Sequence, residues 1–131
     1  MPSDQQSMKA AMQAYVDGLN RGDAEAVIAL FADDAVIEDP VGTGPKQGQA
    51  IRDWFQQAVA MKAQLTLATP IRGSHGNAAA MAFTVTTEWE GRRVRIRSLD
   101  VCTFDEAGHI MRLEAYWGPD DVESGTVCAG C

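Results

Sequence analysis

Apolar residues in the N-terminal half of the chain recur at the three- and four-residue spacing of amphipathic helices. This spacing predicts a first helix over residues 3–20, and Asp23 is well suited to cap a second helix after Arg21-Gly22. A third helix is predicted after the glycine-rich loop of residues 41–48. The predicted inward side chains are Met8, Met12, Tyr15, Val16 and Leu19, then Ala24, Val27, Ile28 and Phe31, then Ile51, Trp54, Phe55, Ala58 and Val59.

The period of the apolar residues changes to two from Ala63 onward, which is typical of half-buried strands. Polar turns at residues 74–77, 90–91 and 105–108 separate the predicted strands. The side chains on their predicted inner faces are Leu65, Leu67 and Ile71, then Ala79, Met81, Phe83, Val85, Thr87 and Trp89, then Val94, Ile96, Ser98, Asp100, Cys102 and Phe104, then Met111, Leu113, Ala115 and Trp117.

Helices followed by a meander of antiparallel strands predict an α+β fold. Three N-terminal helices are expected to pack on a curved, mainly antiparallel sheet and to form a cone-shaped pocket with it. Residues 1–118 are expected to form a single domain, because a chain of 131 residues can bury roughly two-thirds of its unfolded surface. Residues 119–131 are predicted to be a flexible tail that contains Cys128 and Cys131.

The formal net charge of −7 disfavours nucleic acids and anionic membranes as partners and favours small uncharged or apolar ligands. The N-terminus lacks the features of a signal peptide, and no apolar run reaches the roughly 20 residues of a membrane span. We therefore expect a soluble, cytoplasmic protein. In that compartment Cys102 is predicted to be a small buried hydrophobic residue, and no metal site is predicted because further ligands beside Cys128 and Cys131 are not visible.

The outer face of the strand after residue 77 carries small uncharged side chains where a solvated strand normally carries Lys or Glu. This pattern favours a homodimer that packs through the outer sheet face over a plain surface of small residues. The side chains concerned are Ala78, Ala80, Ala82, Thr84 and Thr86.

Asp39 ends a short predicted strand directly before Pro40, which biases the backbone of Asp39 toward extended dihedrals. The two-residue period places Asp39 on the same face as Ile37, so an inward Ile37 implies an inward carboxylate. An aspartate before a proline is also commonly a turn former or a helix cap. Tyr15 has a similar alternative, because a tyrosine on an inner helix face often only buries its ring.

Asp100 interrupts an apolar inner face, where an unpaired carboxylate is costly unless it becomes neutral or finds a partner. Arg93, Arg95 and Arg97 have the opposite parity and are predicted to face away from Asp100. A protonated Asp100 is the cheaper outcome, and it converts an acceptor into a hydrogen-bond donor. A neutral acid and the hydroxyl of Tyr15 in one cavity form an oxyanion hole, and an ionised Asp39 near the pocket mouth can act as a base.

Several separated segments of the chain resemble the bacterial Δ5-3-ketosteroid isomerases. The resemblance extends from about Met8 to Trp117, nearly the whole chain, and the motifs agree in order. The resembling segments are residues 15–23, 29–35, 38–42, 99–101 and 115–117.

The resemblance implies a cofactor-independent isomerase that moves a carbon–carbon double bond into conjugation with the 3-keto group of a steroid. In the family, the residues matching Tyr15 and Asp100 hold the dienolate oxygen, and the residue matching Asp39 moves the proton. Phe31 and Phe55 stand where family members often carry further tyrosines that hydrogen-bond to the catalytic one. The side chains expected to line the steroid slot are Phe55, Phe83, Val85, Ile96, Leu113 and Trp117.

Two other functions stay open from the sequence. A binding protein for a sterol or another apolar metabolite needs the same pocket but not the base. An epoxide hydrolase or a polyketide cyclase on this fold is expected to hold a polar, water-positioning set of Asp, Arg and Asn in the pocket, whereas the arginines here are predicted to face outward. His75 and His109 fall in or next to turns and are predicted to be surface residues without a catalytic role.

Overall fold

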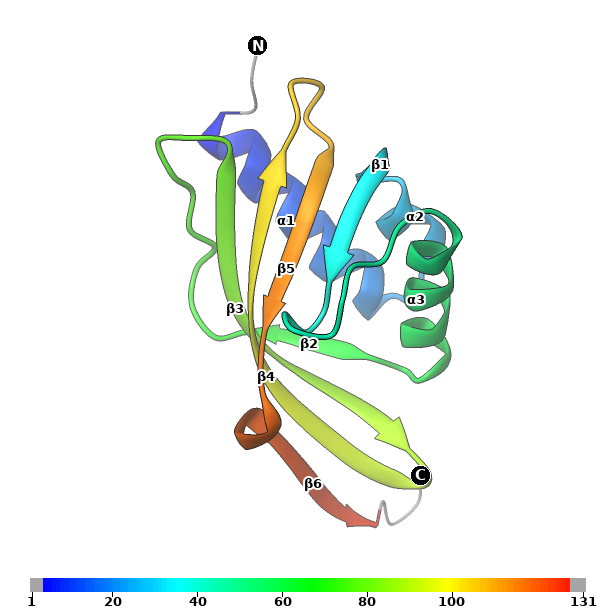
Figure 1. Cartoon of the computed structure of the whole chain (residues 1–131). Coiled ribbons are helices and arrows are strands. Elements are labelled where there is room, and N and C mark those ends of the chain that lie inside the picture. Colours follow the sequence, from blue (N-terminus) through cyan, green and yellow to red (C-terminus); the bar gives the residue numbers. More distant parts are fainter. Residues whose placement is uncertain (1–3, 128–131) are drawn as a thin grey trace.

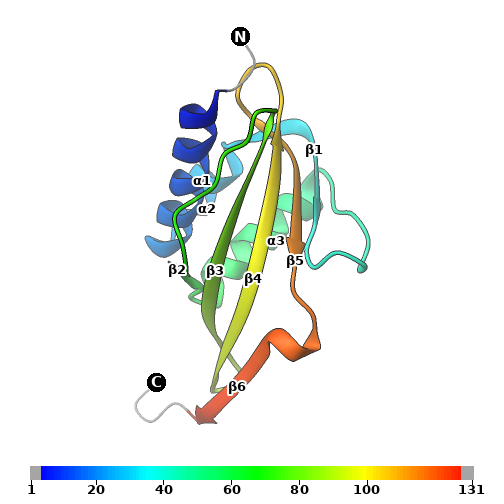
Figure 2. The same ribbon diagram turned by 90° about the vertical axis from the view of Figure 1, so that its left-hand side faces the viewer.

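Three α-helices pack beside a curved sheet in the computed structural model, which describes residues 4–127 (Figure 1). Figure 2 shows α1 and α2 on one side of β3 and β4. The predicted α+β class is confirmed. The elements are α1 (Gln5–Asn20), α2 (Ala24–Ile28), β1 (Phe31–Glu38), α3 (Gln49–Ala60), β2 (Gln64–Leu67), β3 (Ala78–Trp89), β4 (Arg92–Phe104), β5 (Ile110–Tyr116), η1 (Pro119–Asp121) and β6 (Val122–Val127).

The strand order of the sheet is β1-β5-β4-β3-β2, and β6 pairs with β4 beyond the end of β5. β1 runs parallel to β5, and the other pairs are antiparallel. The sheet is therefore mixed but mainly antiparallel, as predicted. The long β3 and β4 strands continue past the helices, where β6 lies along β4 (Figure 1).

Side-chain burial along β3 and β4 follows the predicted alternation. Met81, Asp100 and Cys102 are buried on the inner face, whereas Arg93 and Arg95 are exposed on the other. Near the turn between β3 and β4 the helices no longer cover the inner face of the sheet, so Trp89 is 54% exposed. The inward stripe of α1 is also confirmed, because all five of its predicted residues are buried. These residues are Met8, Met12, Tyr15, Val16 and Leu19.

The structure corrects three details of the predicted elements. Phe31 begins β1 and does not belong to α2, although its side chain is buried. Met111 is 41% exposed and Ile110 is fully buried, because a register shift between Thr103 and Phe104 displaces the alternation at the start of β5. Residues 119–127 form η1 and β6 where a tail was predicted, because β4 is longer than β5 and offers β6 a free edge.

Cys128 and Cys131 lie outside the described residues. In the part of the chain that the structure describes, no helix is long and apolar enough to cross a membrane.

The outer side chains of β3 are partly buried, and Ala82 pairs with Leu99, which pairs with Tyr116. Leu99 and Tyr116 are exposed, so these three residues form an apolar row across three strands of a face that also carries the arginines of β4. The homodimer through this face stays a prediction.

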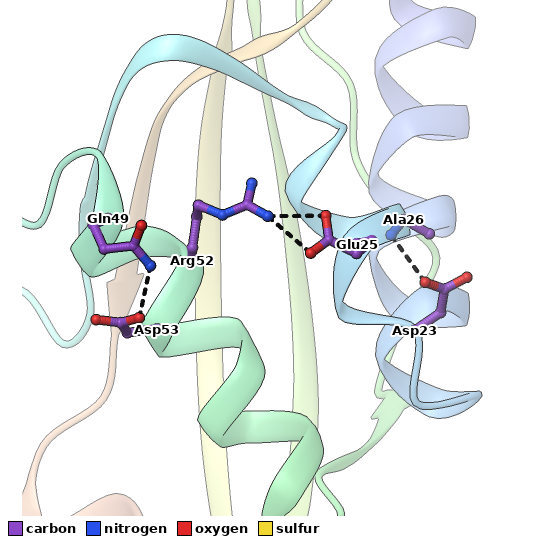
Figure 3. A network of polar contacts seen from close by, with 6 residues as sticks. All are labelled: Asp23, Glu25, Ala26, Gln49, Arg52 and Asp53. Atoms are coloured by element: carbon purple, nitrogen blue, oxygen red, sulfur yellow. Dashed lines mark hydrogen bonds and ion pairs between the residues drawn. The ribbon is translucent and has the colours of Figure 1, made fainter.

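Polar contacts join the helices to one another near their ends (Figure 3). The Asp23 carboxylate accepts a hydrogen bond from the backbone N–H of Ala26 at 3.0 Å, which confirms Asp23 as the cap of α2. The guanidinium of Arg52 on α3 donates to both carboxylate oxygens of Glu25 on α2, at 2.8 and 3.1 Å. This ion pair is exposed, so it orients the two helices more than it stabilises them.

Asn20 attaches the end of α1 to β2 through two hydrogen bonds. Its Nδ2 donates to the carbonyl of Leu65 at 2.9 Å, and its Oδ1 accepts from the N–H of Leu65 at 2.7 Å. A side-chain amide thus replaces a neighbouring strand for Leu65, whose side chain is buried.

We predict that Asn20→Ala lowers the free energy of unfolding by about 1–3 kcal/mol, because both backbone groups of Leu65 lose their partner. Urea denaturation measures the change. Gln13→Ala is the matched control, since the exposed amide of Gln13 donates its hydrogen bond to the exposed Asp17 on the same helix. Equal unfolding midpoints for the two variants would contradict the assignment.

Candidate active site

An apolar cavity lies between the helices and the inner face of the sheet. Tyr15 and Asp39 line it, and the polar side chains of Gln57, Thr87 and Ser98 also reach it. Of the predicted lining residues, Leu113 is fully buried in the core and does not line the cavity. The residues that line the cavity are Tyr15, Leu19, Asp39, Trp54, Phe55, Gln57, Ala58, Met61, Ala63, Leu65, Phe83, Val85, Thr87, Ile96, Ser98 and Trp117.

Tyr15 reaches the cavity from the inner face of α1. Its ring packs edge-on against Phe55, with centroids 5.7 Å apart, and against Phe31, with centroids 6.5 Å apart. The two phenylalanines thus surround Tyr15 with apolar surface. Burial raises the pKa of Tyr15 well above its ordinary value, and electrostatic interactions with Asp100 and Asp39 raise it further. The hydroxyl therefore keeps its proton at neutral pH and can donate a hydrogen bond.

Asp39 follows the last residue of β1, and its peptide bond to Pro40 is cis. The indole Nε1 of Trp117 donates a hydrogen bond to its Oδ1 at 2.8 Å. Burial raises the pKa of Asp39, whereas the Trp117 hydrogen bond and the charge of Lys46 lower it. Burial is the largest of these effects, so the pKa of Asp39 is raised overall and the carboxylate is a stronger base than an exposed one. The sequence placed Trp117 on the inner face, but not its contact with Asp39.

The loop after Asp39 is held by the residues on either side of it. The Glu38 carboxylate accepts hydrogen bonds from the N–H groups of Gly42 and Gly44, at 2.7 and 3.4 Å. Gly42 has a φ of 103°, which strongly favours glycine. The N–H of Val41 donates to the carbonyl of Ala115 in β5 at 2.8 Å. The backbone next to Asp39 is therefore attached to the same strand end that leads to Trp117.

Lys46 closes this loop and was missed in the sequence, where it is a single lysine among glycine and proline residues. Its backbone exchanges two hydrogen bonds with Ile37, at 2.7 and 3.0 Å. Its Nζ lies 3.4 Å from the backbone carbonyl of Asp39 and 4.3 Å from the centroid of the Trp54 ring. The ammonium group is thus held between the base and the cavity wall.

Asp100 lies on the inner face of β4 and is 1% exposed, and it is not itself among the residues that line the cavity. Its Oδ1 accepts a hydrogen bond from Ser98 Oγ at 2.9 Å, and within residues 4–127 its buried Oδ2 has no partner. Burial raises the pKa of Asp100 well above its ordinary value, and the charge of Asp39 raises it further. The predicted outward arginines are confirmed, so no guanidinium offsets this effect. Asp100 is therefore neutral over a wide pH range.

The three polar groups divide into one base and two donors. Burial raises the pKa of both carboxyl groups, but Trp117 and Lys46 limit the rise at Asp39, whereas the charge of Asp39 adds to the larger rise at Asp100, so Asp39 ionises first. Tyr15 and Asp100 both remain protonated. This arrangement can remove a proton from a carbon acid and stabilise the oxyanion that results.

Comparisons with known proteins show which family the sequence resembles. The model of the SnoaL-like domain matches residues 12–113. The chain is 36% identical over 115 residues to a steroid Delta-isomerase of Nocardioides simplex, which covers 88% of this chain and 93% of that protein. It is 30% identical over 126 residues to the epoxide hydrolase LasB of Streptomyces lasalocidi, covering 92% of this chain and 44% of that protein.

A solved structure has the same fold. It is that of the epoxide hydrolase/cyclase-like enzyme SalBIII, which acts in pyran ring formation in the polyether salinomycin. The TM-score is 0.84 at 29% sequence identity, over 91% of this chain and 96% of that one.

We predict that Trp117→Phe raises the pKa of Asp39. The substitution keeps an aromatic ring in the cavity but removes the N–H that favours the ionised carboxylate, while burial continues to oppose ionisation. A pH titration of the side-chain carbon of Asp39, followed by nuclear magnetic resonance of protein labelled with ¹³C at aspartate, measures the shift.

Trp89→Phe is the matched control, because the indole of Trp89 is 54% exposed and lies outside the cavity. It should leave the titration of Asp39 unchanged. A titration of Asp39 that is the same in Trp117→Phe and in the unchanged protein would show that the indole hydrogen bond does not tune the base.

Proposed function

The chain belongs to the SnoaL-like domain family and is ketosteroid isomerase-like, and from this premise we propose that it is a steroid Δ-isomerase that needs no cofactor. Its substrates are 3-oxo-Δ5-steroids and its products are 3-oxo-Δ4-steroids. The observation that carries the proposal is that one carboxylate, Asp39, and one protonated donor, Tyr15, line the same apolar cavity, while a second protonated donor, Asp100, is buried next to it and hydrogen-bonded to the lining residue Ser98.

In the proposed reaction the Asp39 carboxylate removes a proton from C4 of the steroid. The electrons of the C4–H bond form a C3–C4 double bond, and those of the carbonyl π bond move to the C3 oxygen, which gives a dienolate. Protonated Asp39 then returns the proton to C6. The electrons of the C5–C6 double bond form the new C6–H bond, those of the C3–C4 double bond form the C4–C5 double bond, and a lone pair of the C3 oxygen restores the carbonyl, so atoms and electrons balance without an added reactant.

Tyr15 and Asp100 stabilise the dienolate between the two steps. Both are neutral donors in a region that water does not reach, so their hydrogen bonds strengthen as charge develops on the C3 oxygen. Burial serves the chemistry here because it keeps both protons in place. Apolar side chains, among them Phe83, Val85 and Ile96, then form walls that suit the steroid rings.

The walls of the cavity favour isomerisation over epoxide opening. Two of the similar proteins are named as epoxide hydrolase or epoxide hydrolase/cyclase-like enzymes. Opening an epoxide with water calls for side chains that bind and orient that water. Among the described residues that line this cavity, the uncharged polar ones are Tyr15, Gln57, Thr87, Ser98 and Trp117, and none is an arginine or an asparagine.

We predict that Tyr15→Phe and Asp100→Ala each slow turnover on the order of 10²- to 10³-fold, because each removes one donor to the oxyanion. Asp100→Asn should slow it less, since an amide still donates, and Asp39→Asn should abolish it. The assay follows the ultraviolet absorbance of the conjugated product formed from 5-androstene-3,17-dione.

Tyr116→Phe is the matched control for Tyr15→Phe, because Tyr116 is 46% exposed on the outer face of the sheet. It should retain full turnover. A binding protein for a sterol would give a different result: the unchanged protein would bind the steroid without any gain in absorbance, and Asp39→Asn would bind it equally well. That outcome would overturn the proposed isomerase.

A further inference from the structure

Ser98 contacts Asp100 from the same strand face. It precedes Asp100 by two residues on β4, so both side chains point inward, and it pairs with Phe83 of β3. Its Oγ donates a hydrogen bond to Asp100 Oδ1 at 2.9 Å. Ser98 is partly buried and lines the cavity, whereas Asp100 is almost completely buried beside it.

This contact distinguishes the two oxygens of Asp100. A protonated carboxyl group has one O–H donor and one oxygen that acts mainly as an acceptor. Because Oδ1 already accepts from Ser98, the proton is favoured on Oδ2. Oδ2 is also the one buried side-chain oxygen within residues 4–127 that has no hydrogen-bond partner. An unpaired buried donor is costly, so we expect the Oδ2–H group to donate its hydrogen bond to a bound molecule.

Resting on the proposed isomerase function, we propose that Ser98 is a positioning residue. It fixes the rotation of the Asp100 carboxyl group so that Oδ2–H, and not Oδ1, is presented to the C3 oxygen of the steroid. Ser98 acts through Asp100 and does not need to touch the substrate.

The effect of Ser98 on the pKa of Asp100 shows whether Ser98 orients the Asp100 carboxyl group or controls its protonation. The Ser98 hydrogen bond lowers the pKa of Asp100, against the larger effects of burial and of Asp39. Removing it therefore raises that pKa further and keeps Asp100 neutral to higher pH. The other titratable groups that interact electrostatically with Asp100 are Asp39, Tyr15 and Cys102. A loss of activity in Ser98→Ala must then come from misplacement of the donor and not from its ionisation.

The test compares Ser98→Ala with Ser98→Thr, which keeps a hydroxyl group, and with Ser74→Ala. Ser74 is the matched control, because its Oγ donates to the carbonyl of Ala78 at an exposed turn. We expect Ser98→Ala to lower kcat about 3- to 10-fold at every pH with little change in KM, the size of one lost hydrogen bond. Ser98→Thr should recover most of kcat, and Ser74→Ala should retain it.

A second readout does not depend on activity. Infrared spectra of free protein labelled with ¹³C at aspartate report the carbonyl stretch of neutral Asp100, which should move to higher frequency in Ser98→Ala because the carbonyl oxygen loses its donor. The band should stay in place in Ser74→Ala. An unmoved band in Ser98→Ala, or a kcat equal to that of Ser74→Ala, would overturn the role of Ser98. An inactive unchanged protein whose band still moves would overturn the isomerase proposal and leave the hydrogen bond in place.

Discussion

The burial of an aspartic acid without a cationic partner is the constraint on which the rest of the site depends. Asp100 lies inside the sheet, its charged form is disfavoured by burial, and the arginines of its own strand point to the other face. The proton that it keeps costs folding free energy at neutral pH, because the unfolded chain would release it. A protein that tolerates this cost has a neutral donor where most proteins have a leucine or a valine.

The other elements of the site follow from that donor. The ionised base must sit close enough to act on the same molecule, yet its charge makes Asp100 still harder to ionise, so the two carboxyl groups separate into different protonation states. Trp117 and Lys46 favour the ionised form of Asp39, and the loop contacts of Glu38 hold it at the end of β1. Tyr15 lacks a tyrosine behind it, and Phe31 and Phe55 leave its hydroxyl free to donate to a ligand.

Period-two alternation was sufficient to place Asp100 inward and its arginines outward, because side chains on a regular strand alternate whatever the tertiary structure. Pro40 similarly marked Asp39 as the end of a strand. Alternation fails where the strand is irregular, as at the register shift beside Phe104, which exposes Met111. It also does not tell a cavity wall from the core, since Leu113 is inward and fully buried but does not line the cavity. The contacts of Lys46 and Trp117 with Asp39 depend on how the chain folds back on itself, so a local sequence pattern does not reveal them. The position of β6 likewise depends on the part of β4 that extends beyond β5.

We expect Asp100 to be neutral and Asp39 to be ionised at the same pH, although the two carboxyl groups interact electrostatically. Neutron diffraction from crystals of the deuterated protein at neutral pH tests this expectation most directly, because deuterium is seen at the oxygen that carries it. We predict deuterium on Oδ2 of Asp100 and none on either carboxylate oxygen of Asp39. An Asp100 without deuterium, or a deuterated Asp39, would contradict the assigned protonation states.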